Sequence, residues 1–251
     1  MWKTLSARTF LCALSLYGIT YPLRALRWIL LTGDKRTSRV LWEYTVITGI
    51  HTAAANFLPF KSGELAFPVL LKERGYPYSN SLVFLLMGRF MDLAVMITLF
   101  ALFYLGPGGF FPVLMVLVVI FSLRRKAFSL YERISRTVTF LQKFLHPLGR
   151  LSEISTGGFI SMFLLTSLVW VLKLMAVSEI TSAVSGFPML RTLLLALGAE
   201  MAFLIPVSGW LGLGNYEAGW AMASTLVDPS MDGGGAFFAH TFLIMASAVA
   251  G

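Results

Sequence analysis

Long apolar stretches separated by short polar segments run through nearly the whole chain. Several match the roughly 20 residues that an α-helix needs to cross a bilayer, for example LVFLLMGRFMDLAVMITLFALFYL at 82–105. The pattern predicts an all-α, polytopic transmembrane helical bundle with about seven or eight spans. We expect these spans at 5–31, 40–58, 79–105, 109–123, 158–183, 189–206 and 216–227, with a last one that starts near residue 236.

The last apolar stretch, AFFAHTFLIMASAVAG, is shorter than a full span and carries no charged cap. Either the final helix is short or the sequence is trimmed there. We expect residues 1–251 to form a single transmembrane domain, with a basic segment at 124–157 inside it.

The segment 124–150 carries seven lysines and arginines against one acidic residue, Glu132. Basic loops stay on the cytoplasmic side of a membrane, so we expect this one to be cytoplasmic. Apolar residues within it recur at steps of three and four, which predicts an amphipathic helix lying on anionic headgroups. A docking site for a cytosolic partner is the alternative. The apolar positions are Tyr131, Ile134, Val138, Leu141 and Leu145.

Counting spans backwards from this loop gives a full orientation. It places the N-terminus, with Lys3 and Arg8, on the cytoplasmic side together with 59–78. The same count places DKRTSR, at 34–39, outside, which opposes the positive-inside rule.

Composition excludes an ordinary soluble domain, because 57% of the residues are hydrophobic and only 13% are charged, against about 25% charged in soluble domains. The net charge of +8 comes from basic residues between the apolar spans, so anionic lipid explains it and we expect no nucleic-acid partner. Cys12 is the single cysteine, which excludes an intrachain disulfide and a CxxC metal site.

Two apolar regions, 56–75 and 204–223, are interrupted by a proline, a glycine-bearing turn and a glutamate. Non-helical backbone at membrane depth is tolerated only where protein or a water-filled cavity satisfies it, and broken helices in matching positions indicate a transport site. Half-helix N-termini there would suit a phosphate. Ordinary interfacial loops are the alternative. The residues that we single out are Asn56, Pro59, Lys61, Gly63 and Glu64 in the first region, and Pro206, Gly209, Gly212, Gly214 and Glu217 in the second.

Several charges lie inside predicted spans, where an ionised side chain costs about 2.5–3.5 kcal/mol. Arg89 and Asp92 are three residues apart and share a helix face, so they form either a structural ion pair or part of a substrate site. Lys173 lies near the middle of its span, and we expect it to face inward. Glu200, deep in an apolar run, is either a neutral hydrogen-bonded carboxyl or a proton-coupling group.

The first span carries Arg24 and Arg27 on one face. They either bind headgroups in a generic way or grip a phosphate together, which arginine does better than lysine. We interpret His51 and His240 as packed, satisfied side chains rather than relay groups.

Three motifs together resemble a known family. They are N-x-x-P-x-x-x-G-E, then R-x-x-D in the next span, then P-x-x-G-x-x-G-x-x-x-x-E. With the basic pair Arg24 and Arg27, they resemble the transmembrane domain of bacterial lysylphosphatidylglycerol synthases and of related stand-alone flippase-like proteins. The matching residues are Asn56, Pro59, Gly63 and Glu64, then Arg89 and Asp92, then Pro206, Gly209, Gly212 and Glu217.

This resemblance implies a lipid-translocating module with two re-entrant hairpins in the cytoplasmic (inner) membrane of a bacterium or archaeon. Two positions depart from the family pattern: Phe67 stands where the family usually has an arginine, and Gly88 where it tends to have an acid. The headgroup is therefore not fixed by the resemblance. No aminoacyl-transferase domain follows, so we expect that this chain alone does not make an aminoacylated lipid.

We predict a transporter that moves an anionic phospholipid, aminoacyl-lipid or polyprenyl-phosphate-linked lipid by alternating access. We expect no enzymatic activity, no cofactor and no metal; homo-oligomer formation stays open. A lipid-headgroup enzyme is a weaker interpretation, because PVSGWLG has Trp210 where a lipid phosphatase needs histidine, and Ser208 has no nearby base. A scaffold that docks a synthase through 124–157 is the remaining alternative, but it would not need charges inside the membrane.

Overall fold

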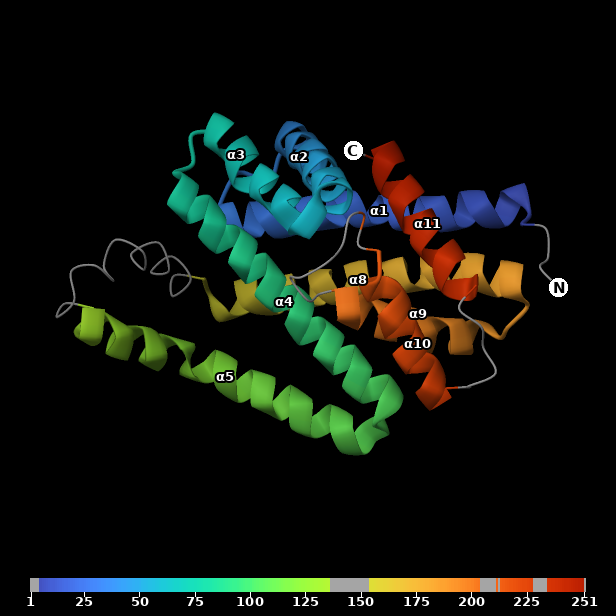
Figure 1. Ribbon diagram of the computed structural model, residues 1–251. Helices are drawn as coiled ribbons and strands as arrows, with labels where there is room; N and C mark the ends of the chain where they lie inside the picture. The colour runs from blue at the N-terminus through green and yellow to red at the C-terminus, as the bar shows by residue number, and fades with distance from the viewer. Residues whose placement is uncertain (1–4, 136–153, 204–210, 212, 228–233, 251) are drawn as a thin grey trace.

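The computed structural model describes residues 5–135, 154–203, 211, 213–227 and 234–250, and the described chain is all-α (Figure 1). Each segment predicted as a span contains a helix whose described bounds agree to within a few residues, except that the helix predicted at 109–123 begins at 106 and continues to 135. The elements are α1 (Ala7–Thr32), α2 (Ser38–Phe57), a 3₁₀ helix η1 (Pro59–Leu65), α3 (Ala66–Glu73), α4 (Tyr78–Tyr104), α5 (Gly106–Ser135), α8 (Thr156–Ser185), α9 (Met189–Phe203), α10 (Asn215–Val227) and α11 (Gly234–Ala250).

Three stretches of the described chain are long and apolar enough to cross a membrane: Tyr78–Tyr104, Gly106–Leu123 and Thr156–Ser185. Their outer faces carry large apolar side chains, such as Met115 and Val118 on α5, which are more than half exposed. In water such a surface would be unfavourable, whereas lipid tails cover it at no cost. These helices therefore support a membrane location.

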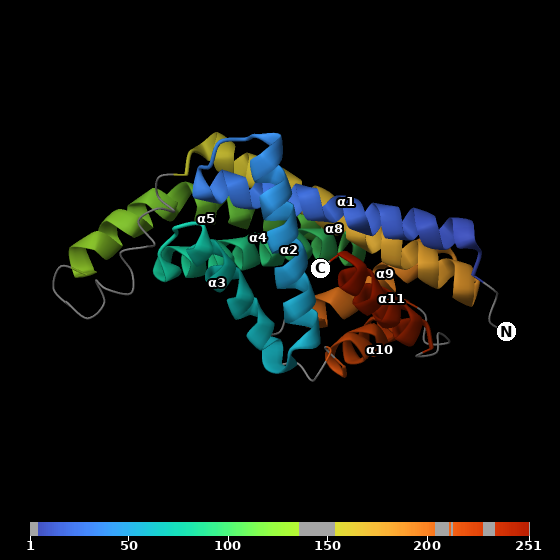
Figure 2. The same ribbon diagram turned by 90° about the horizontal axis from the view of Figure 1, so that it is seen from above.

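The centre of the molecule is formed by α1 and α8, which lie side by side and run in opposite directions (Figures 1 and 2). One apolar core packs around them with α2, α3 and α4, and includes Trp28 and Phe67. A second core packs around them with α9, α10 and α11, and includes Tyr216 and Trp220. Thus α2, α3 and α4, which follow α1 in the chain, form one core with α1 and α8, whereas α9, α10 and α11, which follow α8, form the other.

The first interrupted region forms a helical hairpin. α2 stops because Pro59 follows, which forces the preceding Leu58 into an extended conformation (φ −88°, ψ 140°). η1 and α3 then return alongside α2 (Figure 2). A Cβ on Gly63 would lie 2.0 Å from the carbonyl oxygen of Ala54, so only glycine lets the returning backbone pack this closely.

The second interrupted region lies between α9 and α10, which also pack against each other. A Cβ on Gly219 would lie 2.5 Å from the Cβ of Ala202 and 2.7 Å from the carbonyl oxygen of Gly198, so two glycines bring these helices together. The segment between them, with the predicted site residues Pro206, Gly209 and Gly212, lies outside the described residues.

A polar cluster ties the α1–α2 loop to the segment after α3. Asp34 accepts hydrogen bonds from Tyr76 (2.6 Å) and Tyr44 (2.9 Å), and it pairs with Arg74 at 3.2 Å. Arg74 also pairs with Glu43 on the first turns of α2. The α1–α2 loop and the α3–α4 connection therefore lie at the same end of the molecule.

This contact corrects the orientation deduced from the sequence. Counting every apolar stretch as a full crossing placed 34–39 outside and 59–78 inside. That assignment is wrong, because Asp34 and Arg74 are in direct contact. The physical reason is the hairpin: α3 brings the chain back to the end from which α2 began.

Replacing Asp34 with asparagine should lower the free energy of unfolding at neutral pH by about 1–3 kcal/mol, since hydrogen bonds to a charged group are lost. Burial acts to raise the pKa of Asp34, but hydrogen bonds from Tyr76, Tyr44 and Arg74 outweigh it and hold this pKa below its ordinary value. The stabilisation is therefore complete above the unfolded value of about 3.9 and is lost as pH falls through the lower, folded value.

Unfolding in detergent, followed by circular dichroism between neutral and acid pH, measures this effect. Asp34→Asn should flatten the acid dependence, and Glu73→Gln, at an exposed position on α3, is the matched control. Equal acid dependence in the wild type and Asp34→Asn would contradict the assignment.

Candidate functional site

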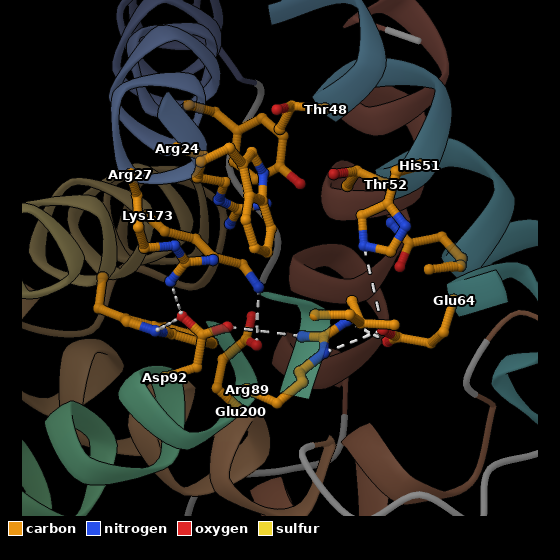
Figure 3. Close-up of a pocket in the computed structure, with 16 residues that line it drawn as sticks. Arg24, Arg27, Thr48, His51, Thr52, Glu64, Arg89, Asp92, Lys173 and Glu200 are labelled. Carbon is orange, nitrogen blue, oxygen red and sulfur yellow. Dashed lines mark hydrogen bonds and ion pairs between the residues drawn. The ribbon is translucent and has the colours of Figure 1, made fainter. Parts of the chain in front are cut away.

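A polar cavity lies in the middle of the bundle, where α1, α2, η1, α4, α8 and α9 meet (Figure 3). It is open at one side and has a volume of about 80 Å³. The apolar helices around it bury charged side chains that point into a common space. The residues that line it are Tyr17, Arg24, Arg27, Trp28, Thr48, His51, Thr52, Ala55, Asn56, Glu64, Leu85, Arg89, Asp92, Trp170, Lys173 and Glu200.

One ion pair connects α1 to α4. Arg27 Nη1 donates to Asp92 Oδ1 at 2.6 Å, and Arg27 is only 4% exposed. From α8, Trp170 Nε1 donates to the same carboxylate oxygen at 3.1 Å, and Thr166 Oγ1 lies 3.3 Å from Arg27 Nη1. Arg89, the neighbour predicted for Asp92, lies farther from it, with Nη1 3.6 Å from Oδ2. Asp92 therefore holds three helices together.

A second ion pair links the first hairpin to α4. The guanidinium of Arg89 donates to both carboxylate oxygens of Glu64, with Nε 3.0 Å from Oε2. A guanidinium and a carboxylate in this two-point arrangement have a fixed mutual orientation. His51 Nε2 lies 3.9 Å from Glu64 Oε2 on the α2 side. The turn of the hairpin is thus fastened to the wall of the cavity.

A third ion pair lies deeper, between α8 and α9. Lys173 Nζ donates to Glu200 Oε2 at 2.7 Å, and its ammonium group lies 4.7 Å from the centre of the Trp170 ring. Glu200 is 1% exposed. Each group is the buried counter-ion that the other needs.

The cavity carries an excess of positive charge. Arg24, Arg27, Arg89 and Lys173 face three carboxylates, Glu64, Asp92 and Glu200. Within the described part of the chain, no ion pair includes Arg24; its guanidinium lies 6.0 Å from the centre of the Tyr21 ring. Arg24 is the cation left for a ligand.

Several buried polar atoms of the lining residues also have no hydrogen-bond partner within the described chain. They are Arg27 Nε, Trp28 Nε1, His51 Nδ1 and Glu200 Oε1. Buried polar groups are normally satisfied, so three nitrogens and one carboxylate oxygen remain for a polar ligand. These atoms and the guanidinium of Arg24 could bind an anionic headgroup with hydroxyl or phosphoryl oxygens.

A smaller cavity lies behind the first and shares Tyr17, Asn56, Lys173 and Glu200 with it. Its far wall comes from the second hairpin and from α11, with Leu211, Tyr216, His240, Leu243 and Ile244. There His240 Nδ1 lies 2.6 Å from Glu217 Oε1, and the other oxygen of Glu217 accepts the backbone N–H of Gly214 at 2.8 Å.

The structure brings most of the predicted site residues to these two cavities. Asn56 lines both, and Gly63 and Gly214 shape the hairpin backbones. The side chain of Lys61 lies outside what the structure describes, as do Pro206, Gly209 and Gly212. Arg27 is engaged by Asp92, whereas no ion pair of the described chain includes Arg24.

Sequence reasoning missed the aromatic and hydroxyl groups of the site. Trp28, Thr166 and Trp170 were not singled out, and the only available signal was that Trp28 follows Arg27 and that Trp170 lies three residues before Lys173. It also interpreted His51 and His240 as satisfied core residues. Both are buried as expected; His51 lines the main cavity, and both ring nitrogens of His240 have partners, the carboxylate of Glu217 and the carbonyl oxygen of Leu211.

Within the described ranges, no group of three or more histidines, cysteines and carboxylates could hold a metal ion. A family model described as the lysylphosphatidylglycerol synthase TM region matches residues 1–249. No curated protein and no solved structure matches this sequence.

Proposed function

The chain belongs to the lysylphosphatidylglycerol synthase transmembrane-region family, and from this premise we propose that it translocates a lipid with an anionic headgroup across a cytoplasmic membrane. One observation carries the proposal: a cavity among apolar helices is lined by four cations and three carboxylates, and Arg24 has no counter-ion in the described chain. A charge of this kind is expensive inside a membrane unless a ligand or partner uses it.

In this proposal both hairpins are re-entrant. α3 has 8 residues and α10 has 13, and at 1.5 Å per residue a 13-residue helix is about 20 Å long, shorter than the roughly 30 Å hydrocarbon core. The membrane is then crossed by α1, α4, α5, α8 and α11. The two hairpins enter from opposite ends of the bundle (Figure 1); the first contributes Glu64 to the larger cavity, and the second contributes Leu211 and Tyr216 to the smaller one.

The same interpretation gives an orientation. The α1–α2 loop, with Lys35, Arg36 and Arg39, lies at the same end as Arg74 and as the end of α5 with its basic residues (Figure 1). The positive-inside rule makes this end cytoplasmic, which puts the start of α1 on the outer side.

In a Cys12→Ala background, Arg39→Cys in intact cells should resist a membrane-impermeant maleimide until the cells are opened. Labelling of intact cells would reverse the orientation.

The mechanism follows from which polar groups of the cavity have no partner in the described chain. Arg24 binds the phosphate of the headgroup, the unpaired nitrogens of Trp28, Arg27 and His51 bind its oxygens, and the acyl or prenyl tails stay in the surrounding lipid. Rocking of one half of the bundle against the other then exposes the cavity to alternate leaflets. The lipid is moved without chemical change and without a cofactor, and basic residues at 124–157 recruit anionic lipid on the cytoplasmic side.

Reconstitution in liposomes tests this function. With a reporter lipid that a membrane-impermeant reagent bleaches in the outer leaflet, the protein should move a phosphatidylglycerol-type reporter faster than a phosphatidylcholine reporter. Arg24→Gln should slow the anionic reporter about tenfold or more, because one charge-assisted hydrogen bond, about 1.5–3 kcal/mol, is lost.

The matched control is Arg39→Gln, which removes an arginine whose side chain is 89% exposed. Equal movement of both reporters, or a wild-type rate in Arg24→Gln, would contradict an anion-selective cavity. Absence of movement of any reporter by folded protein would contradict translocation itself.

A further inference from the structure

His240, on α11, lies between two groups that both normally accept hydrogen bonds. Its Nδ1 is 2.6 Å from the carboxylate oxygen Oε1 of Glu217 on α10, and its Nε2 is 2.9 Å from the backbone carbonyl oxygen of Leu211. The imidazole therefore joins α11 to the second hairpin at two points.

These two contacts determine how many protons the pair must hold. A neutral imidazole has one N–H donor and one acceptor nitrogen, whereas an imidazolium has two donors. The carbonyl of Leu211 needs a donor at Nε2. The short contact at Nδ1 then requires either a second proton on His240, facing the carboxylate, or a proton on Glu217, facing a neutral ring.

We propose that Glu217 and His240 form a proton-binding site that holds one exchangeable proton, and that this proton clamps α11 to the second hairpin. The inference rests on the proposed function, in that the proton would couple an ion gradient to the movement of the lipid.

The first half of the chain contains the corresponding contact with a different cation. There the hairpin glutamate, Glu64, pairs with Arg89, which lies 25 residues later on the helix after the hairpin. In the second half, Glu217 pairs with His240, 23 residues later on the helix after its hairpin. Arginine keeps its proton under all physiological conditions, but histidine can lose one. The contact between Glu64 and Arg89 therefore does not depend on pH in the physiological range, whereas the contact between Glu217 and His240 depends on a bound proton.

The surroundings allow this proton to exchange. The side chain of Glu217 is 35% exposed, while that of His240 is 5% exposed, so the carboxylate is the open side of the pair. The ring of Tyr216 stacks on the imidazole with centres 4.9 Å apart. Across the small cavity, Lys173 and Glu200 face Glu217 and His240, and their opposite charges cancel. The other polar residues there, Asn56 and Tyr17, are uncharged.

Loss of the proton breaks one of the two contacts. The proton passes from the pair through the exposed carboxylate to a water molecule, which leaves an anionic Glu217 and a neutral His240. One ring nitrogen then turns its lone pair towards an acceptor, either Glu217 or the carbonyl of Leu211. Leu211 is held in the left-handed region at φ 57°, an unfavourable conformation for this residue, so its release relaxes the hairpin.

Nuclear magnetic resonance on the full chain in lipid nanodiscs tests the inference without any transport. The chain has three histidines, so ¹⁵N-histidine labelling gives three imidazoles, and His240→Gln identifies the signals of His240. As the pH is raised, the pair should lose one proton, seen either at the His240 imidazole or at the ¹³C-labelled carboxyl of Glu217.

Glu217→Gln is the informative variant, because its amide N–H can donate to a neutral Nδ1 and keep both contacts without an exchangeable proton. Its His240 should be neutral with Nε2–H at neutral pH, and the titration should disappear. A His240 with a single N–H and an ionised Glu217 across the whole pH range in the wild type would overturn the proposal.

The transport readout separates the two proposals. In liposomes with a pH gradient, the rate of lipid movement should change severalfold with the gradient in the wild type and stay constant in Glu217→Gln. If the proton titrates but no lipid moves, the proposed function fails and the proton site stands. If lipid moves at a rate that the gradient does not alter and no proton titrates, the proton site alone fails.

Discussion

Replacing Asp92 with alanine should lower the free energy of unfolding by about 3–5 kcal/mol, the cost of removing one partner of a buried ion pair. Arg27 is 4% exposed and its closest counter-ion is Asp92, at 2.6 Å. Without that carboxylate, a guanidinium stays charged inside the bundle. The indole N–H of Trp170 loses its acceptor at the same time, so α1, α4 and α8 lose their common polar contact.

Unfolding by denaturant in detergent micelles measures this loss, and two controls define its cause. Asp92→Asn keeps an oxygen for Trp170 and Arg27 and should cost clearly less than the alanine. Arg39→Ala removes the exposed pair with Glu43 and should cost less than about 1 kcal/mol. Equal losses in Asp92→Ala and Arg39→Ala would mean that the buried pair does not hold the helices together.

Most of the helices could be predicted from the sequence, because an apolar stretch long enough to cross a bilayer has few alternatives to a helix. The end of α2 at Phe57 was also predictable, since Pro59 disfavours a helical conformation at Leu58. The continuation of α5 to residue 135 was not, because the change from apolar to basic residues at Arg124 marks the membrane surface and not the end of a helix. Hydropathy reports the surroundings of a helix, whereas its length depends on local propensity.

The partners of the buried charges were much less predictable. Local spacing favoured Arg89 as the partner of Asp92, but the closest cation is Arg27, 65 residues away on α1. Helical periodicity shows which residues share a face, and only the packing of α1 beside α4 and α8 decides which faces meet. The placement of 34–39 and 59–78 on opposite sides failed for a related reason, because a hairpin and a full crossing contain similar apolar residues.

The contact of His240 with Glu217 was missed because the two residues lie on different helices. A usable signal is nevertheless present in the sequence: each interrupted region contains a glutamate, and the next helix carries Arg89 in one half and His240 in the other at nearly the same distance along the chain. If the two halves of the chain are aligned on these glutamates, His240 falls close to the position of Arg89. The contact between Glu64 and Arg89 then suggests a contact between Glu217 and His240.

The buried pair Lys173 and Glu200 gives the sharpest test of whether the charges serve the fold or the lipid. Both residues line the two cavities, so an anionic headgroup that passes from one to the other must contact them. Glu200→Leu alone leaves Lys173 charged and buried, and should cost about 3–5 kcal/mol of unfolding free energy. Lys173→Met combined with Glu200→Leu should return to within about 1 kcal/mol of the wild type, since apolar residues of similar size replace buried ion pairs well.

Lipid movement should respond in the opposite way. In the double variant, the anionic reporter should move about 10- to 100-fold more slowly than in the wild type, because a headgroup that meets an apolar wall loses a charge-assisted hydrogen bond of about 1.5–3 kcal/mol. Denaturant unfolding and reporter bleaching on the same preparations measure the two quantities together. A double variant as stable as the wild type that moves lipid at the wild-type rate would make the pair purely structural and confine headgroup binding to the side of Arg24. A stable variant with little movement would place Lys173 and Glu200 on the path of the headgroup, since a structural loss could not produce that combination.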